Sequence, residues 1–208
     1  MPSLNLIDAN FSFDIISTGN GTLSIHLSLT ADIQAKVEAR KIMKYLTLIR
    51  HAKSSWKQAE LADIDRPLNK RGLASAPVMG RVLKERAVQF DKVFTSSARR
   101  ARITIELICE EIGIAPASIV VSDDLYTFSY RDILKWLKRV NDNYHDIALG
   151  GHNPACHNLF SVLTNKSLDK YPTCAVARFQ FDLGSWSEIT AGTGKLVFFD
   201  IPRNHLTG

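Results

Sequence analysis

The stretch Tyr45-Leu46-Thr47-Leu48-Ile49-Arg50-His51 decides the fold class of this chain. Its apolar part has the composition of a buried β-strand, and two basic residues follow the strand directly. Two later segments have the same layout: residues 93–95 run into 96–100, and residues 146–149 run into 150–154. In an open parallel sheet, ligands bind outside the carboxyl ends of the strands. We therefore expect four basic side chains to converge at one edge of the sheet: Arg50, His51, Arg100 and His152.

From residue 45 onward, predicted strands and helices alternate along the chain. Strands are expected near 45–50, 91–95, 118–122 and 145–150, and helices near 73–86, 98–113, 129–142 and 154–164. This alternation predicts an α/β fold, with a mostly parallel sheet and helices on both of its faces. Residues 174–183 and 195–199 are expected to add late strands at the sheet edge. Pro77 is expected in or near the first turn of its helix, where its missing N–H does least harm.

Residues 1–42 lie outside this pattern and pose a separate question. Apolar positions alternate over 11–16 and 23–29, and Gly19-Asn20-Gly21 between them is a turn signal. A β-hairpin is therefore expected, followed by a helix from about 31 to 43. The alternative is that Met43 is the true start of the protein. We therefore expect one main domain over 43–208, with residues 1–42 either an N-terminal extension or the result of a misassigned start.

Composition narrows the class of protein. The chain has 208 residues and a formal net charge of +5, yet no dense Lys/Arg stretch is interleaved with aromatic residues. This favours a soluble surface with an anion pocket over nucleic-acid binding. The three cysteines form no Cys-x-x-Cys, which argues against a disulfide framework and a zinc site. No run approaches the ~18 apolar residues of a membrane span, and no basic signal-peptide region appears. We expect a cytoplasmic monomer with no nucleic-acid or membrane partner.

Together, the four basic side chains would form a pocket for a tetrahedral dianion. A neutral imidazole is a good nucleophile toward phosphorus, and His51 is placed to attack it. Arg50 and Arg100 can fork onto phosphate oxygens, and His152 is expected to donate a hydrogen bond to one of them. A divalent metal held by both histidines and a carboxylate is the alternative. Two arginines aimed at the same point would repel such an ion, so no metal and no cofactor are expected.

Four motif blocks resemble the histidine phosphatase superfamily. They are Arg50-His51-Ala52-Lys53-Ser54-Ser55-Trp56, Asp65 to Gly72, Ser96 to Thr104, and Gly151-His152-Asn153-Pro154. Ala52 replaces the usual glycine, as in the SixA-like phosphohistidine phosphatase branch, and the resemblance spans roughly residues 43 to 203. It implies a phosphoglycerate mutase-like fold and a phosphohistidine intermediate. It also implies that the arginine directly before Ala101 is the second phosphate ligand. The expected substrate-binding residues are Lys53, Ser54, Arg66 and Asn153.

The resemblance does not identify which residue acts as the general acid. Relatives that hydrolyse phosphate esters use a glutamate after the third strand, but residues 122–127 contain none. Asp124 is the candidate acid there, or else an ordinary turn aspartate. A phosphohistidine substrate depends less on such an acid, because its leaving imidazole can take a proton from solvent at the distal nitrogen.

The spacing between Arg100 and Asp124 leaves no room for a capping insertion, so we expect a lidless, open site that admits a side chain of a folded protein. We therefore expect a metal-independent phosphatase acting on phosphohistidine in proteins. The alternatives are a phosphatase of small phosphate esters and a non-catalytic phosphoprotein-binding module. A mutase is less favoured, since it needs a lid that excludes water.

Overall fold

The computed structural model describes residues 11–17, 23–29 and 43–205. The chain forms two compact units, Met1–Lys41 and Ile42–Gly208. In the first unit, strands β1 (Phe11–Ser17) and β2 (Leu23–Leu29) pair in antiparallel register, with Phe11 opposite Leu29. The predicted turn at 19–21 and the predicted helix at 31–43 lie outside the described residues.

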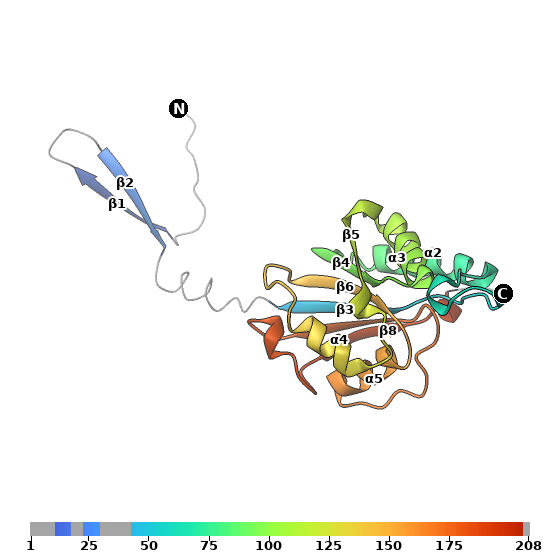
Figure 1. The fold of residues 1–208 in the computed structure, drawn as a ribbon. Coiled ribbons are helices and arrows are strands. Elements are labelled where there is room, and N and C mark those ends of the chain that lie inside the picture. The colour runs from blue at the N-terminus through green and yellow to red at the C-terminus, as the bar shows by residue number, and fades with distance from the viewer. Residues whose placement is uncertain (1–10, 18–22, 30–42, 206–208) are drawn as a thin grey trace. The chain divides into compact units, whose positions relative to one another are not determined.

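The second unit is built on a six-stranded sheet with the order β5-β4-β6-β3-β7-β8 (Figure 1). Strands β3, β4, β5 and β6 run parallel to one another, while β7 is antiparallel to both β3 and β8. The predicted mostly parallel α/β fold is therefore confirmed. The strand bounds are β3 Lys44–Arg50, β4 Lys92–Ser96, β5 Ile119–Ser122, β6 Asp146–Gly151, β7 Val176–Phe181 and β8 Lys195–Asp200.

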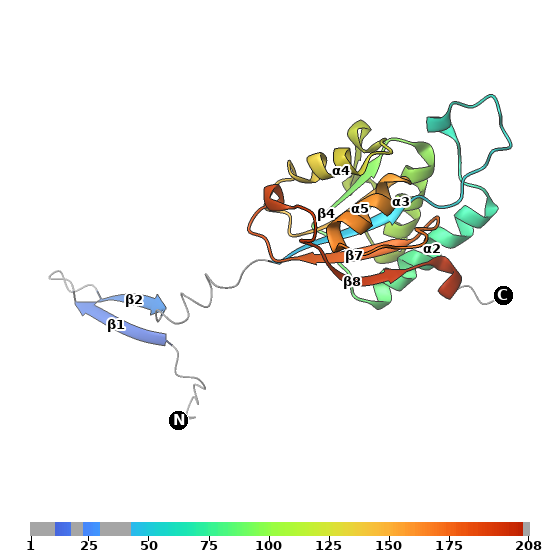
Figure 2. The same cartoon turned by 90° about the horizontal axis from the view of Figure 1, so that it is seen from below.

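Four α-helices cover the two faces of this sheet (Figures 1 and 2). Helices α2 (Lys70–Glu85) and α3 (Arg99–Ile112) pack on one face, and α4 (Tyr130–Leu137) and α5 (Ala155–Thr164) pack on the other. Short 3-10 helices connect these elements. They are η1 Asp63–Asp65, η2 Pro116–Ser118, η3 Asp123–Leu125, η4 Trp186–Glu188 and η5 Pro202–Asn204.

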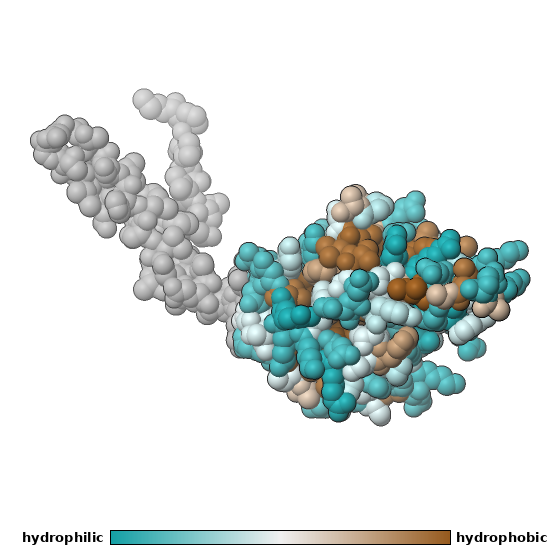
Figure 3. All heavy atoms as spheres, viewed as in Figure 1, coloured by the Kyte–Doolittle hydropathy of each residue, from teal (hydrophilic) through white to brown (hydrophobic). Residues whose placement is uncertain are grey.

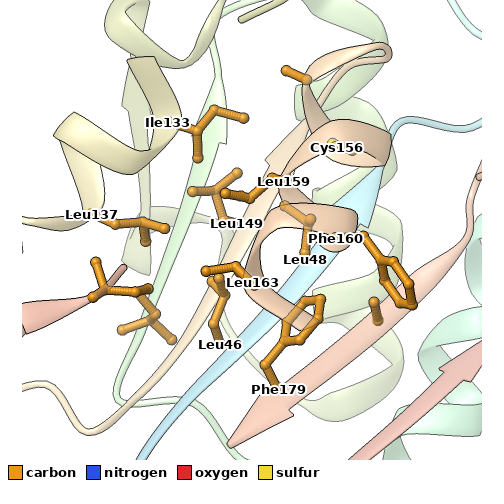
Figure 4. Packing of buried hydrophobic residues seen from close by; sticks show 14 of the residues in the cluster. Leu46, Leu48, Ile133, Leu137, Leu149, Cys156, Leu159, Phe160, Leu163 and Phe179 are labelled. Carbon is orange, nitrogen blue, oxygen red and sulfur yellow. The ribbon is translucent and has the colours of Figure 1, made fainter. Parts of the chain in front are cut away.

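The central strand β3 contributes to two hydrophobic cores because successive side chains of a strand point to opposite faces. Leu46 and Leu48 face α4 and α5, where they lie among Ile133, Leu137, Leu159 and Leu163 (Figure 4). Ile49 faces the other way, into the core formed with Met79, Leu83, Ile105 and Ile108. Burying each large aliphatic side chain is worth about 1.5–3 kcal/mol, so both cores fix the position of β3.

Two helix boundaries differ from the predicted ones. Helix α2 begins at Lys70 because the Asn69 side chain accepts a hydrogen bond from the Gly72 N–H. Pro77 therefore lies inside the helix rather than in its first turn, which removes one N–H from the helix ladder. Helix α4 ends at Leu137, short of residue 142. There the Asn141 side chain accepts a hydrogen bond from the Asn143 N–H, which favours a turn.

The sheet ends at β5, a strand of four residues on one edge. Its Val120 and Val121 are 37% and 47% exposed, and Figure 3 shows hydrophobic surface over this edge. A short edge strand limits pairing with other chains. In the described part of the chain, no helix is long and apolar enough to cross a membrane. Cys109, Cys156 and Cys174 are buried free thiols.

Candidate active site

A pocket of about 440 Å³ opens at the carboxyl ends of the parallel strands. It lies where β3 ends at Arg50 and where β4 runs into α3. Of the four predicted strand-end residues, Arg50, His51 and Arg100 line the pocket, and His152 is buried directly behind His51. The pocket is lined by Arg50, His51, Lys53, Ser54, Trp56, Asp63, Arg66, Arg100, Tyr126, Phe128 and Thr173.

The backbone around His51 is tied to three other elements. The His51 N–H donates to Gly151 O at 3.0 Å, at the end of β6. The Cys174 N–H donates to His51 O at 3.1 Å, and the Ala52 N–H donates to Thr104 Oγ1 of α3 at 2.9 Å. These bonds hold the residue after β3 in one position, so the imidazole is placed before any ligand arrives.

The His51 imidazole is oriented as a nucleophile. Its Nδ1 lies 2.8 Å from Ala52 O, and a carbonyl only accepts, so Nδ1 carries the proton and Nε2 keeps its lone pair. Burial and, to a smaller extent, the guanidinium groups of Arg100 and Arg50 together lower the pKa of His51 to about 4, against the opposing effect of the hydrogen bond to Ala52. At neutral pH the ring is therefore uncharged and able to attack an electrophile.

The second histidine, His152, stands beside the first. The two ring centroids are 5.1 Å apart, and His152 is only 1% exposed. Its Nε2 lies 2.8 Å from Ser96 Oγ, and its Nδ1 faces Arg100 Nη2 at 3.5 Å. Burial, then His51 and Arg100, lower the pKa of His152 to about 3. Because a guanidinium N–H only donates, Nδ1 is the acceptor in this contact, and Nε2 carries the proton and donates it to Ser96 Oγ. An anion that takes over Arg100 would free Nδ1, and because the Ser96 hydroxyl can also donate to Nε2, His152 could then carry its proton at Nδ1 and donate it to the anion.

The two arginines reach the pocket from different elements. Arg50 Nη1 donates to Tyr171 O at 2.7 Å, and its buried Nε has no hydrogen-bond partner among the described residues. Burial lowers the pKa of the Arg50 guanidinium. Arg100, in the first turn of α3, is 3% exposed. Both guanidinium groups therefore offer donors in a largely desolvated setting, where an anion binds most strongly.

A carboxylate already occupies part of this anion site. Asp63 Oδ2 accepts hydrogen bonds from Arg100 Nη2 at 2.8 Å and from Tyr126 Oη at 2.7 Å, and Oδ1 accepts from Arg66 Nη1 at 2.7 Å. Arg100 Nη1 also donates to the Asp63 backbone carbonyl. Burial pushes the pKa of Asp63 upward, but the hydrogen bonds from Tyr126, Arg66 and Arg100 hold it well below its ordinary value. Asp63 is therefore ionised and acts as an internal anion.

Sequence reasoning missed Asp63. It stands three residues before Arg66, just ahead of the motif block that was assigned from Asp65 onward. An acidic residue one helical turn before a candidate phosphate ligand is the signal that could have drawn attention to it. Tyr126, whose hydroxyl reaches Asp63, gave no such signal.

The four expected substrate-binding residues divide into two groups. Lys53, Ser54 and Arg66 line the pocket. Arg66 donates to Ser54 Oγ at 2.7 Å and stacks on Trp56, 3.1 Å from the ring centroid, so its guanidinium is fixed. Asn153 does not line the pocket. Its Nδ2 donates to Tyr171 O at 3.0 Å, the carbonyl that Arg50 also contacts, so it supports the pocket wall.

The position of Asp124 does not suit the general acid considered above. Asp124 is 61% exposed, does not line the pocket and forms an ion pair with Arg139 at 2.8 Å. The reason is local: in the 3-10 helix η3, Leu125 turns inward to the core and Asp124 faces solvent. Tyr126, two residues further on, is the side chain that reaches the pocket.

The glycines before His152 also serve a different purpose from the expected close approach to a ligand. A Cβ on Gly150 would lie 2.5 Å from Ile105 Cγ1 of α3 and 2.9 Å from Thr95 Oγ1. The missing side chain lets α3 pack directly on β6. That packing places Arg100, at the start of α3, against His152.

The arrangement suits phosphate chemistry better than metal binding. The described residues contain no group of three or more His, Cys, Asp or Glu side chains that could hold a metal ion. The guanidinium groups of Arg50, Arg66 and Arg100 all lower the pKa of His51, and the same positive field repels a divalent cation. Donors on two sides of a neutral imidazole are the elements needed to bind and attack a phosphoryl group.

Comparison with known proteins places this site in a family. A family model described as the histidine phosphatase superfamily (branch 1) matches residues 46–146, a range that holds Arg50, His51 and Arg100. An uncharacterised protein of Mycobacterium tuberculosis is 32% identical over 166 residues, and the match covers 74% of this chain and 100% of that protein.

Solved structures share the fold. One is a protein of Nakamurella multipartitia assigned as phosphohistidine phosphatase SixA, with a TM-score of 0.66, 22% identity, and coverage of 77% of this chain and 96% of that chain. Another is the protein histidine phosphatase SixA complexed with tungstate, with a TM-score of 0.66, 21% identity, and coverage of 77% and 98%. The phosphoglycerate mutase-like fold expected from the motifs is confirmed, and the chain belongs to the histidine phosphatase superfamily.

Proposed function

We propose that this protein is a metal-independent phosphatase that removes phosphate from phosphohistidine in proteins through a covalent intermediate on His51. The observation that carries the proposal is the state of the His51 ring. Its Nδ1 is committed to Ala52 O, its pKa is lowered to about 4, and it lines the same pocket as Arg50 and Arg100. This is a neutral nucleophile held beside two phosphate-binding groups.

The reaction proceeds in two balanced steps. Nε2 of His51 attacks phosphorus, the bond from phosphorus to the substrate imidazole breaks, and that imidazole takes a proton from solvent at its distal nitrogen. Water then attacks phosphorus, the bond to Nε2 breaks, and inorganic phosphate leaves. Arg50, Arg100 and His152 donate hydrogen bonds to the equatorial oxygens, whose charge must be stabilised in both transition states.

Phosphohistidine is favoured over phosphate esters because the pocket lacks a protonated carboxyl group. Asp63 is the one carboxyl among the lining residues, and its hydrogen bonds keep it ionised. An alkoxide leaving group needs a proton from a general acid, whereas an imidazole does not. The fold shared with proteins called phosphohistidine phosphatases is consistent with this preference.

A phosphoenzyme trap tests the covalent step. Wild-type protein, quenched in alkali during turnover of a ³²P-phosphohistidine peptide, should retain acid-labile label, and His51→Ala should retain none. His145→Ala is the matched control, because His145 does not line the pocket. Turnover of His51→Ala at the wild-type rate would exclude the mechanism.

A substrate comparison tests the leaving group. With EDTA present, the phosphohistidine peptide should be hydrolysed much faster than the same peptide carrying phosphoserine. Preference for phosphoserine would replace the phosphohistidine proposal with an ester phosphatase.

A further inference from the structure

Two further pockets adjoin the active-site pocket, and they differ in charge. One, of about 740 Å³, shares Tyr126 with the active-site pocket, and we call it the mixed pocket. Its charged lining residues carry both signs: Asp123, Asp124, Asp132, Lys135, Lys138 and Arg139. The other, of about 530 Å³, shares Thr173 with the active-site pocket. Its charged lining is entirely positive and consists of Arg71, Lys170 and Arg203. We call this second pocket the basic groove.

The three cations of the basic groove are available to a ligand. Each is exposed, and none forms an ion pair with another described residue. The nearest acid along the chain to Arg203 is Asp200, which is buried and already paired with Arg86 at 2.6 Å. In the mixed pocket, by contrast, Arg139 is neutralised by Asp124. The basic groove therefore keeps an unbalanced positive field at its surface.

Apart from the hydroxyl residues Ser75 and Thr173, the rest of the lining is apolar. Pro172, Phe199, Ile201 and Pro202 are buried or half-buried there. A lone inorganic anion would make no use of these side chains. A polypeptide segment can contact them with its own backbone and side chains while its acidic residues meet the cations at the rim. An apolar centre with a polar rim is the usual anatomy of a protein interface.

We propose that the basic groove binds an acidic segment of the phosphoprotein whose phosphohistidine enters the active-site pocket; this rests on the proposed function. Two contacts join the groove to the catalytic residues. Thr173 lines both pockets. Arg71 precedes Gly72, and a Cβ at Gly72 would collide with the backbone of Lys53, so the start of α2 lies directly against the loop after His51. A chain emerging from the active-site pocket past Thr173 would enter the groove.

The test uses two synthetic phosphohistidine peptides that differ only in flanking residues, Glu in one and Gln in the other. Wild-type protein should show a kcat/KM about five- to tenfold higher on the acidic peptide, the size expected of a few exposed ion pairs. The preference should shrink as salt is added. In the double variant Arg71→Glu/Arg203→Glu the preference for the acidic peptide should vanish, while kcat/KM on the neutral peptide should stay within about twofold of wild type.

A second double variant controls for net charge. Lys84 lies at the far end of α2 from Arg71, and Lys195 lies at the far end of β8 from Arg203. Both lysines are exposed. Lys84→Glu/Lys195→Glu makes the same change in charge and should keep the acidic preference. Loss of preference in both double variants, or in neither, would overturn the groove assignment, as would turnover of both peptides by wild type without preference. No turnover of either peptide would instead overturn the proposed function and the groove with it.

Discussion

Replacing Asp63 with Asn should tighten the binding of phosphate. The Asp63 carboxylate accepts a hydrogen bond from Arg100 Nη2 at 2.8 Å, and Arg100 is the group assigned to a phosphate oxygen. An incoming phosphoryl group must take Arg100 away from this internal anion. The Asp63→Asn change would keep the shape of the side chain and a carbonyl that accepts from Tyr126, but it would remove the charge that competes with phosphate for Arg100.

The magnitude follows from the contact and its exposure. A hydrogen bond to a charged group contributes about 1.5–3 kcal/mol when buried, whereas an exposed ion pair contributes about 0.2–1 kcal/mol. Arg100 is 3% exposed but the Asp63 side chain is 43% exposed, so the pair lies between the buried and the exposed case. We therefore take its interaction energy as about 1 kcal/mol, where the two ranges approach each other. Because 1.4 kcal/mol is a factor of ten, phosphate should bind about fivefold more tightly to the variant.

The assay is the competitive inhibition constant of inorganic phosphate, supported by calorimetric titration. Asp65→Asn is the matched control, because Asp65 lies in the same 3-10 helix but does not line the pocket. It should leave the constant unchanged. If Asp63→Asn weakened phosphate binding or left it unchanged, Asp63 would be a support that holds Arg100 in place, and the competition argument would fail.

Four further outcomes are expected. Arg100→Ala should lower kcat/KM by about 10²–10³, the usual cost of one transition-state donor, in steady-state assays. Because the pKa of His51 is lowered to about 4 and its neutral form is reactive, kcat/KM should stay level from about pH 7 to about pH 5 and fall as pH approaches 4; a fall centred on 6.5 would contradict this. Gly150→Ala should lower the free energy of unfolding in urea by about 1–3 kcal/mol through overpacking. A chain that lacks residues 1–42 should fold and keep its phosphatase activity, since the sheet and both cores lie in the second unit; an insoluble product would contradict this.

The convergence of the four basic residues could be predicted because it depends on a rule of topology. Once 45–49 and 146–149 are parallel neighbours, the residues that follow each strand must meet at one edge, whatever the details of the turns. The pairing of Ile49 with Gly150 and of Arg50 with Gly151 shows this register directly.

The acidic part of the site depends on contacts that no sequence rule supplies. Asp63 reaches Arg100 across 37 positions of the chain, from a short 3-10 helix. The choice between Asp124 and Tyr126 turns on the rotation of η3, where a shift of one residue exchanges a buried side chain for an exposed one. Short 3-10 turns have no periodic signal long enough to fix such a rotation.

Asp63 balances the positive charge of the site. Without a carboxylate beside them, the buried guanidinium groups of Arg66 and Arg100 would leave uncompensated positive charge in a desolvated pocket, which is costly. Lowered pKa values keep both histidines neutral, and the Asp63 carboxylate compensates Arg100 and Arg66. A phosphoryl dianion that takes over Arg100 leaves Asp63 paired with Arg66 and Tyr126. The partners of Asp63 therefore allow it to release one arginine to the substrate while its own charge stays satisfied.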